Sequence, residues 1–561
     1  MKKPVVLKVL NPLSKVAITV QNARRLGTLE GKTVAEVSAT GGWGADRTFP
    51  IIRELLQKRF PGIKFVPYTE FPHSKDIFFW VPLEETVRML MDKGCDAVLI
   101  GNAGGGAAAH HSALGVAAEK AGIPAALITG PEWPDHARMV ARGNGLASLP
   151  VITIPQKVLA GEVMDARPSC EAAIKDIVHA LTEWQPEKTE NENAASLMFE
   201  GASYEDATSK ASNDFMSRGW GDGLPIVPPT EESVSWMMTG TGLNRLEVLG
   251  TRLTPKLGTI TVETVAINAV MAGARPEYLP VILAVVEQLG TPQGRKQVHF
   301  LQEGTAMAAS VLIVNGPIVK ELNINSAFGV MGPGWQANAT IGRAISLLLI
   351  NAGGGQYGPA GAQRQSLPGR YTWCIGENES QNPWSPLNAE LGYGAIANTV
   401  TVMVGRGNQT IMMHPPMEKV LGSMVRAFRG ITVGRCAVPW EQLLLLSPAH
   451  AKLLAENGWS KKDLRTFIYN EARLSQVEAD AAGIVPSADW EYSSPSTSGE
   501  RQHVPMTNRP EDLLIVVAGG QGGSVSTLVP CMERSVTGLI DRYKSTNWDG
   551  LIQKAKKDLR Y

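Results

Sequence analysis

Hydrophobic positions between residues 31 and 185 follow two alternating patterns. Short apolar runs predict buried strands, and the segments between them space apolar residues at the helical period, which predicts amphipathic helices. In the segment PIIRELLQKRF, for example, these positions are Ile51, Ile52, Leu55 and Leu56. Strands and helices that alternate with short links predict a doubly wound parallel sheet of the α/β class, flavodoxin-like or racemase-like, with ligands at the carboxyl ends of the strands.

The pattern changes after residue 185. Residues 186–205 lose apolar periodicity and gain charge, which predicts a linker. The rest of the chain predicts a larger α/β or α+β domain, which opens with the turn-rich GWGDGLPIVPPT at 219–230 and continues into buried helices. We therefore expect a first domain at 1–185, a linker at 186–205 and a second domain at 206–561.

The stretch 96–129, DAVLIGNAGGGAAAHHSALGVAAEKAGIPAALIT, predicts a strand, a glycine-rich corner, a helix and a second strand. At such a corner the helix N–H groups point outward, and glycines let the backbone approach a ligand closely. Asn102, Gly104, Gly105 and Gly106 are therefore candidates for holding a carboxylate, phosphate or enolate. Tight packing of strand and helix explains the glycines equally well.

A second glycine cluster, GGQGGSVST, follows the apolar run DLLIVVA near the carboxyl end. We predict a strand, a turn and a helix here too, with Gly520, Gly522 and Ser524 as candidate ligand-binding residues. Neither cluster has the GxGxxG or GxxxxGK[ST] pattern of nucleotide sites. The sequence leaves open whether the two corners share one cleft.

His110 and His111 lie one turn into the helix after the first corner. Adjacent helical residues point about 100° apart, so the pair cannot bind one metal ion from the same face. Each is a candidate acid or base, and a buried structural histidine is the alternative for each. The amino end of a helix favours the neutral imidazole.

The segment TGGWGADRTF ends the first predicted strand at the same edge of the sheet. Gly42 and Trp43 are candidate substrate contacts, with the Trp43 ring stacking on a flat substrate. Arg47 is a candidate clamp for a carboxylate, and Asp46 a residue that orients it or acts as a base. Asp46 fits equally well as the amino cap of the next helix. If the two strands are adjacent, this segment lies beside the glycine corner.

Two carboxylates in CIGENESQNPW, Glu377 and Glu379, would share one face of a strand. Together with His414 of MMHPP they are candidate ligands for a divalent cation, and a solvated loop is the alternative. No other cofactor is implied, and the cofactor stays unknown.

The composition of the chain bears on which kinds of molecule it binds. Lys plus Arg and Asp plus Glu both number 53, so the chain has no overall field that would attract nucleic acid. No apolar run reaches the roughly 18 residues of a spanning helix, and the first residues are too weakly apolar for a signal peptide. The five cysteines are scattered without a CxxC, which suits a reducing cytoplasm. We expect a soluble cytoplasmic protein with a small-molecule substrate, without nucleic acid or membrane, in a homo-oligomer or with another subunit.

The glycine corner and its AGIP lead into the next strand resemble the UGSC-type selenoprotein family, and more loosely the protein B component of glycine reductase. The resemblance covers 1–185 best, although GWGDGLPIVPPT and TVETVAINAVMAGARPEYLP are similar to larger multidomain members, and the βαβ order distantly resembles the Asp/Glu racemase superfamily. The family corner, U-G-x-C-T, carries a selenol or thiol for reductive bond cleavage. Here Gly104 to Ala108 stand in its place, so that chemistry is not implied.

We therefore expect an enzyme of the lyase, hydratase or hydrolase type that acts without a thiol on a small carboxylated or heteroatom-bearing substrate. The alternative is a non-catalytic subunit of a reductase-like complex that has lost its nucleophile and binds a ligand or a partner.

Overall fold

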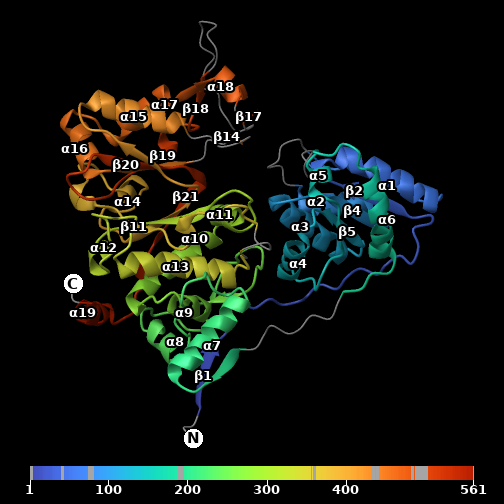
Figure 1. Ribbon diagram of the computed structural model, residues 1–561, viewed down its shortest axis with the longest axis horizontal. Helices are drawn as coiled ribbons and strands as arrows, with labels where there is room; N and C mark the ends of the chain where they lie inside the picture. Colours follow the sequence, from blue (N-terminus) through green and yellow to red (C-terminus); the bar gives the residue numbers. More distant parts are fainter. Residues whose placement is uncertain are drawn as a thin grey trace.

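The computed structural model describes residues 4–38, 43–73, 81–186, 195–355, 357, 362–430, 436–437, 441–481, 485–486 and 503–559. The chain forms a smaller lobe from its first third and a larger lobe from the rest (Figure 1). The candidate residues of the first glycine corner belong to the smaller lobe, at the side that faces the larger one.

A parallel sheet of five strands, in the order β3-β2-β4-β5-β6, forms the centre of the smaller lobe. Alternate residues of each strand point to opposite faces, so that Val34 and Leu99 contact α1 and α6 while Ala35 and Ile100 contact α2 and α3. This arrangement confirms the predicted doubly wound sheet. The elements are β2 (Thr33–Val37), α1 (Ala45–Arg59), β3 (Lys64–Val66), α2 (Leu83–Asp92), β4 (Ala97–Ala103), α3 (Gly106–Lys120), β5 (Ala125–Thr129), α4 (Pro134–Gly143), β6 (Val151–Thr153), α5 (Gln156–Leu159) and α6 (Arg167–Thr182).

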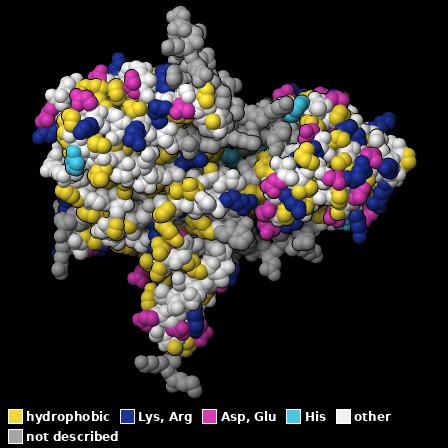
Figure 2. All heavy atoms as spheres, turned by 45° about the horizontal axis from the view of Figure 1, so that its top comes forward, with side chains coloured by type: hydrophobic (Ala, Val, Ile, Leu, Met, Phe, Trp, Pro, Cys, Tyr) yellow, Lys and Arg dark blue, Asp and Glu magenta, His cyan; other side chains and the backbone are white. Residues whose placement is uncertain are grey.

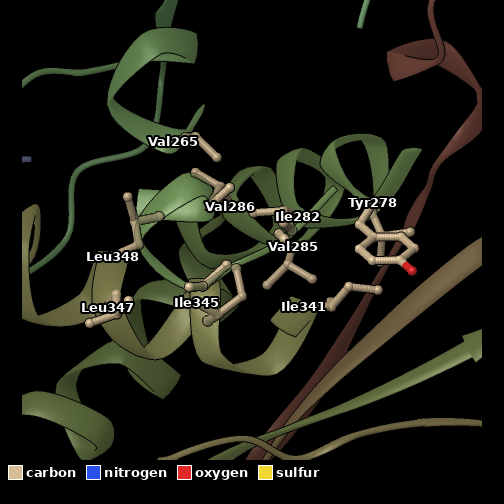
Figure 3. Packing of buried hydrophobic residues seen from close by; sticks show 14 of the residues in the cluster. Val265, Tyr278, Ile282, Val285, Val286, Ile341, Ile345, Leu347 and Leu348 are labelled. Atoms are coloured by element: carbon tan, nitrogen blue, oxygen red, sulfur yellow. The ribbon is translucent and has the colours of Figure 1, made fainter. Parts of the chain in front are cut away.

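The larger lobe contains a mixed sheet of four strands covered by buried helices. The strands, in spatial order, are β11 (Cys374–Gly376), β10 (Ala309–Asn315), β12 (Thr399–Gly405) and β21 (Cys531–Leu539). The helices are α9 (Val262–Met271), α10 (Leu279–Gly290) and α13 (Gln336–Asn351), at the segments that the apolar pattern predicts. Figure 3 shows Val285 and Ile282 of α10 packed against Ile341 and Ile345 of α13.

A second sheet of four strands packs against the first through a shared apolar cluster that includes Val311, Ile313, Leu443 and Val516. Its strands are β13 (Gln409–Met412), β20 (Val525–Val529), β15 (Gln442–Leu446) and β19 (Leu513–Val517), and its outer face is covered by α15 (Met417–Arg429), α16 (Pro448–Glu456) and α17 (Lys461–Glu471). The remaining elements of the larger lobe are α7 (Tyr204–Ser217), α8 (Glu231–Met238), β8 (Val248–Leu249), β9 (Ile260–Thr261), α11 (Pro292–Gln302), α12 (Ile318–Glu321), α14 (Leu387–Glu390), β14 (Cys436–Ala437), β16 (Arg473–Ser475), α18 (Gln476–Ala481), β17 (Val485–Pro486), β18 (His503–Pro505) and α19 (Trp548–Leu559).

The predicted helix after the second glycine cluster is wrong. Residues 525–539 form strands β20 and β21 instead. The run VSTLV alternates β-branched residues with others and has no helical period, and Pro530 follows it, so the local sequence favours an extended chain.

The amino-terminal strand belongs to the larger lobe. β1 (Val5–Leu10) pairs antiparallel with β7 (Ser196–Gly201), which lies within the predicted linker, and Leu7 and Val9 join the core around α9 and α10. The chain therefore enters the smaller lobe from the larger one and returns to it. The division at 185 and 206 stays a prediction. Within the described residues, no helix has the length and apolar character needed to cross a membrane.

Candidate functional site

The first glycine corner joins β4 to α3, and side chains cover it on two sides. Gly105, at φ 56° and ψ −141°, precedes the first residue of α3. A Cβ atom at Gly104 would lie 2.5 Å from the ring of Trp43, and one at Gly105 would lie 3.2 Å from Thr305 in the larger lobe. Glycine is therefore required at this corner, both for the positive φ of Gly105 and for the close packing of side chains. The corner lies where the two lobes meet.

Asn102 links the two segments that the sequence places at one edge of the sheet. Its side chain is fully buried and donates hydrogen bonds to the Trp43 carbonyl and to Thr48 Oγ1, both at 2.8 Å. The strands β2 and β4 that lead into these segments are paired, as the expectation required. Asn102 Oδ1 is buried and has no hydrogen-bond partner among the described residues.

Arg47 and Asp46 lie in the first turn of α1. The Arg47 guanidinium donates to the carbonyls of Val158 at 3.0 Å and Leu159 at 3.2 Å, at the end of α5. These bonds give Arg47 a structural role, and its use as a carboxylate clamp stays a prediction. Asp46 is exposed next to the helix amino end, which its charge stabilises, while Gly44 takes the cap position. Gly42 lies outside the described residues.

His110 and His111 are neutral near pH 7. His111 is fully buried, and burial, with a smaller contribution from His110, lowers its pKa to about 3. Burial also lowers the pKa of His110 to about 4. His110 Nε2 lies 2.8 Å from the Val81 carbonyl, and because a carbonyl only accepts, this nitrogen carries the proton. His110, which is less enclosed than His111, is the better placed of the two for chemistry.

The larger lobe contributes a histidine–carboxylate pair to the same boundary. His299 and Glu303 stand one turn apart at the end of α11, and His299 Nδ1 pairs with Glu303. Thr254 donates a second hydrogen bond to Glu303, which is 3% exposed. Burial alone would raise the pKa of Glu303. The hydrogen bond and charge of His299 outweigh this effect, together with the charge of His136 and the hydrogen bond from Thr254, so the pKa is lowered. Glu303 is therefore ionised and fixes the orientation of the His299 ring.

The histidines of the two lobes influence one another across the boundary. After burial and the Val81 hydrogen bond, the charges of His299 and Glu303 also act on the pKa of His110. His136, on α4, is 5% exposed; burial lowers its pKa, and the charge of Glu303 partly opposes this effect. Its Nε2 atom has no hydrogen-bond partner in the described part of the chain. We call His110, His136, His299 and Glu303 the boundary cluster.

A cleft of about 1700 Å³ is lined by both lobes. Its lining includes Asp135, which precedes His136 in the sequence, but no residue of the boundary cluster or of the first glycine corner. Arg138 and Arg142 of α4 line one wall, close in sequence to His136. The other wall includes Lys256, close in sequence to Thr254, and Arg370. Figure 2 shows basic side chains where the lobes meet. The turn-rich segment that opens the predicted second domain lines the cleft at 219–223.

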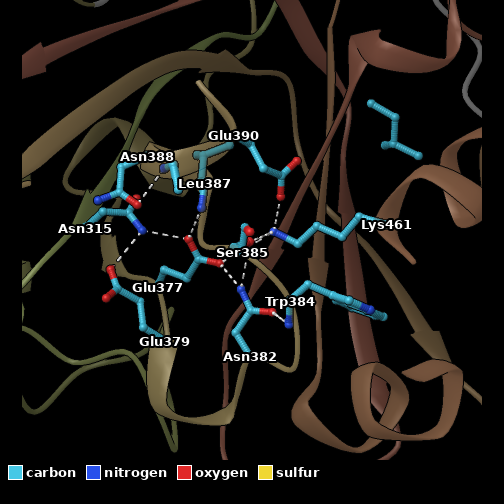
Figure 4. A network of polar contacts seen from close by, with 12 residues as sticks. Asn315, Glu377, Glu379, Asn382, Trp384, Ser385, Leu387, Asn388, Glu390 and Lys461 are labelled. Atoms are coloured by element: carbon cyan, nitrogen blue, oxygen red, sulfur yellow. Dashed lines mark hydrogen bonds and ion pairs between the residues drawn. The ribbon is translucent and has the colours of Figure 1, made fainter. Parts of the chain in front are cut away.

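The candidate metal ligands do not form a site. Glu377 is 2% exposed, and its carboxylate accepts hydrogen bonds from Asn315 at 2.6 Å, Asn382 at 2.8 Å and the Leu387 N–H at 2.8 Å (Figure 4). Glu379 accepts from Asn315 and from the Gly316 N–H, whereas His414 is exposed. Across the described ranges, no three His, Cys, Asp or Glu residues are grouped so as to hold a metal ion. The Glu377 network is structural.

The second glycine cluster lies within the larger lobe, between β19 and β20. A Cβ atom at Gly520 would lie 2.2 Å from the Phe328 ring, and the Gly519 carbonyl accepts a hydrogen bond from Asn378. Because a strand follows Ser524, no helix amino end is available there for an anion. Neither Gly520, Gly522 nor Ser524 lines the cleft.

The smaller lobe is a doubly wound α/β structure whose glycine corner faces the larger lobe. Residues 8–183 match the model of the UGSC family. No curated protein matches the chain.

The sequence interpretation missed His299 and Glu303, and also His136, Arg142 and Arg370. The signal for the first two was HFLQE, whose histidine and glutamate share a helix face at the i, i+4 spacing. That spacing is common on exposed helices, and the effect of this pair on His110 and His136 of the other lobe cannot be predicted from local sequence.

Proposed function

We propose that the protein is an enzyme that makes or breaks a bond in a small carboxylated or heteroatom-bearing substrate by acid–base chemistry. The reaction would be of the lyase, hydratase or hydrolase type. The observation that carries this proposal is the His299–Glu303 pair, which stands with His110 and His136 at the boundary next to the glycine corner.

Each group has a role that its surroundings support. Glu303 accepts the Nδ1 proton of His299, so Nε2 of His299 is the nitrogen that takes a proton from the substrate or returns it. His110 supplies a neutral imidazole nearby. The N–H groups of Gly104 to Gly106 would stabilise negative charge on the substrate once Trp43 is displaced, while Asn102 stays bound to the Trp43 carbonyl and to Thr48.

Four of the five cysteines support chemistry without a thiolate. Cys95, Cys170, Cys374 and Cys531 are all buried. Burial raises the pKa of Cys95 and Cys170 to about 11 and that of Cys374 to about 12, and it raises that of Cys531 further. These four side chains are therefore protonated thiols near neutral pH, and a protonated thiol is a poor nucleophile.

A second candidate is the non-catalytic subunit of a reductase-like complex, in which another chain supplies the thiol. The observation in its favour is that Trp43 and Thr305 cover the glycine corner. Assembly with another subunit or as a homo-oligomer, and a cytoplasmic location, belong to these proposals.

The test is a screen of carboxylated substrates for consumption by the purified protein, with His299→Gln beside it. His179→Gln is the matched control, because His179 also stands four residues before a glutamate on a helix but is exposed on α6. We expect turnover that is lost in His299→Gln and kept in the control. Turnover that survives His299→Gln, or no turnover by any preparation, contradicts the enzyme proposal, and the second outcome favours the binding subunit.

A further inference from the structure

The charged side chains that line the cleft favour an anionic ligand. Three acidic side chains line it, Asp135, Asp222 and Glu263, and each already pairs with an arginine: Arg138, Arg343 and Arg245 respectively. The carboxylates that could neutralise the cleft are thus committed to other partners. An anionic ligand would meet little repulsion from them.

Arg370 is the most enclosed cation of the cleft. It is 9% exposed, donates to the Leu301 carbonyl at 2.8 Å and lies over the Tyr357 ring, 5.7 Å from its centroid. Its Nε atom is buried without a hydrogen-bond partner, and no carboxylate in the described part of the chain forms an ion pair with it. Burying an unpaired charge is costly, so the site fits an anionic group that pairs with the guanidinium.

Arg370 also adjoins the boundary cluster. Leu301, whose carbonyl it contacts, lies between His299 and Glu303 in the sequence of α11 and the turn that follows it. Neither His299 nor Glu303 lines the cleft, and Arg370 is the lining residue that connects the cleft to their helix.

Arg142 supplies a second cation from the smaller lobe. It is half-buried at the end of α4, lines the cleft, and has no ion-pair partner within the described ranges. Arg142 and Arg370 therefore present positive charge from different lobes, and a ligand with one anionic group would use only one of them. The volume of the cleft also exceeds the roughly 300–1,000 Å³ of ordinary small-molecule sites, which leaves room for an extended ligand.

We infer that the substrate carries at least two anionic groups, carboxylate or phosphate, of which Arg370 binds one and Arg142 the other. The inference rests on the proposed function, because it describes the substrate of the same site. Guanidinium groups suit both chemistries, since their paired N–H donors match either oxyanion.

The test measures binding to the full-length protein by calorimetry, with sodium succinate and inorganic pyrophosphate as probes with two anionic groups, and acetate and orthophosphate as the simpler counterparts. We expect a two-group probe to bind at least tenfold more tightly than its counterpart. Tighter binding of succinate than of acetate would identify the substrate as a carboxylate compound. Tighter binding of pyrophosphate than of orthophosphate would identify it as a phosphate compound.

Arg370→Gln and Arg142→Gln should each weaken binding of that probe about tenfold or more, as expected for loss of a charge-assisted hydrogen bond. Arg88→Gln, which removes an exposed charge on α2, is the matched control and should bind like the wild type. Arg370→Lys keeps the charge and serves if Arg370→Gln does not fold. Equal affinity for one-group and two-group probes, or binding that neither variant weakens, overturns the inference. Specific binding without turnover of any substrate would overturn the proposed function alone.

Discussion

The two glycine-rich turns of this chain look alike in sequence and differ in everything that surrounds them. Both follow a buried strand, β4 in one case and β19 in the other. The first turn leads into α3 and meets Thr305 of the other lobe, whereas the second leads into β20 and meets Phe328 of its own lobe. A glycine cluster after a strand therefore indicates a tight turn, and the element beyond it decides whether a ligand can bind there.

The surroundings of the two turns differ in chemistry as well. The first turn lies where the two lobes meet, near His110, His136 and the His299–Glu303 pair. Beside the second, Gly519 and Gln521 are held by the side chains of Asn378 and Gln381. If function resides at the first turn, changes there should affect turnover, and changes at the second should affect only stability.

The largest effect should come from Glu303→Gln. Without the carboxylate, the His299 ring loses its fixed orientation and the charge that stabilises its protonated form, so we expect turnover to fall on the order of 10²–10⁴-fold. Glu183→Gln is the control, because Glu183 pairs with His179 at the same spacing but is exposed. Initial rates with the substrate found by screening measure both. Similar rates in the two variants would show that the active site does not lie at the boundary between the lobes.

Glycine-to-alanine changes compare the turns directly. Gly105 has a backbone conformation that is close to glycine-only and lies against Thr305, so Gly105→Ala should cost on the order of 2–3 kcal/mol of unfolding free energy. Gly522 has φ 80° and open space around it, so Gly522→Ala should cost about 1 kcal/mol. Urea denaturation gives both values. A larger loss of unfolding free energy for Gly522→Ala than for Gly105→Ala would mean that the first turn tolerates a side chain better than the second.

Acid should destabilise the surroundings of the first turn. The pKa of His111 falls from 6.5 to about 3 on folding, so between these values the unfolded chain binds a proton that the folded chain refuses. The stability that this shift contributes is present above pH 6.5 and is lost as the pH falls. At pH 5 the loss is about 2 kcal/mol for this residue.

The pH dependence of the unfolding free energy tests this expectation. His111→Asn should flatten its slope between pH 7 and 5, and His179→Asn, at an exposed position, should leave it unchanged. An unaltered slope in His111→Asn would show that other groups cause the acid sensitivity.

The smallest effect is expected at Arg47. Arg47→Ala removes the hydrogen bonds to Val158 and Leu159, which should lower the unfolding free energy by about 1 kcal/mol. KM should then change less than twofold. A tenfold rise in KM at unchanged stability would instead support Arg47 as the carboxylate clamp.

Local sequence was enough to predict the smaller lobe. The stretch 96–129 forms β4, α3 and β5, because its apolar runs and its glycines each favour one local conformation. The same reasoning failed after Gly523, where the β-branched run that begins at Val525 prefers a strand.

The site could be predicted only in part. Asn102 and Trp43 were expected together, since adjacent parallel strands bring their following segments to one edge. Arg370 binds the Leu301 carbonyl, about 70 residues away in the sequence, and the charge of Glu303 acts on His110 of the other lobe. No local pattern encodes either relation.

A crystal structure of the protein with a bound substrate, or with the two-group probe that binds most tightly, tests the location of the site most directly. We predict that the ligand lies in the cleft between Arg370 and Arg142, beside His299, with the Trp43 ring moved away from Gly104. A ligand bound elsewhere, with the boundary cluster still enclosed and Trp43 still on Gly104, would contradict this assignment.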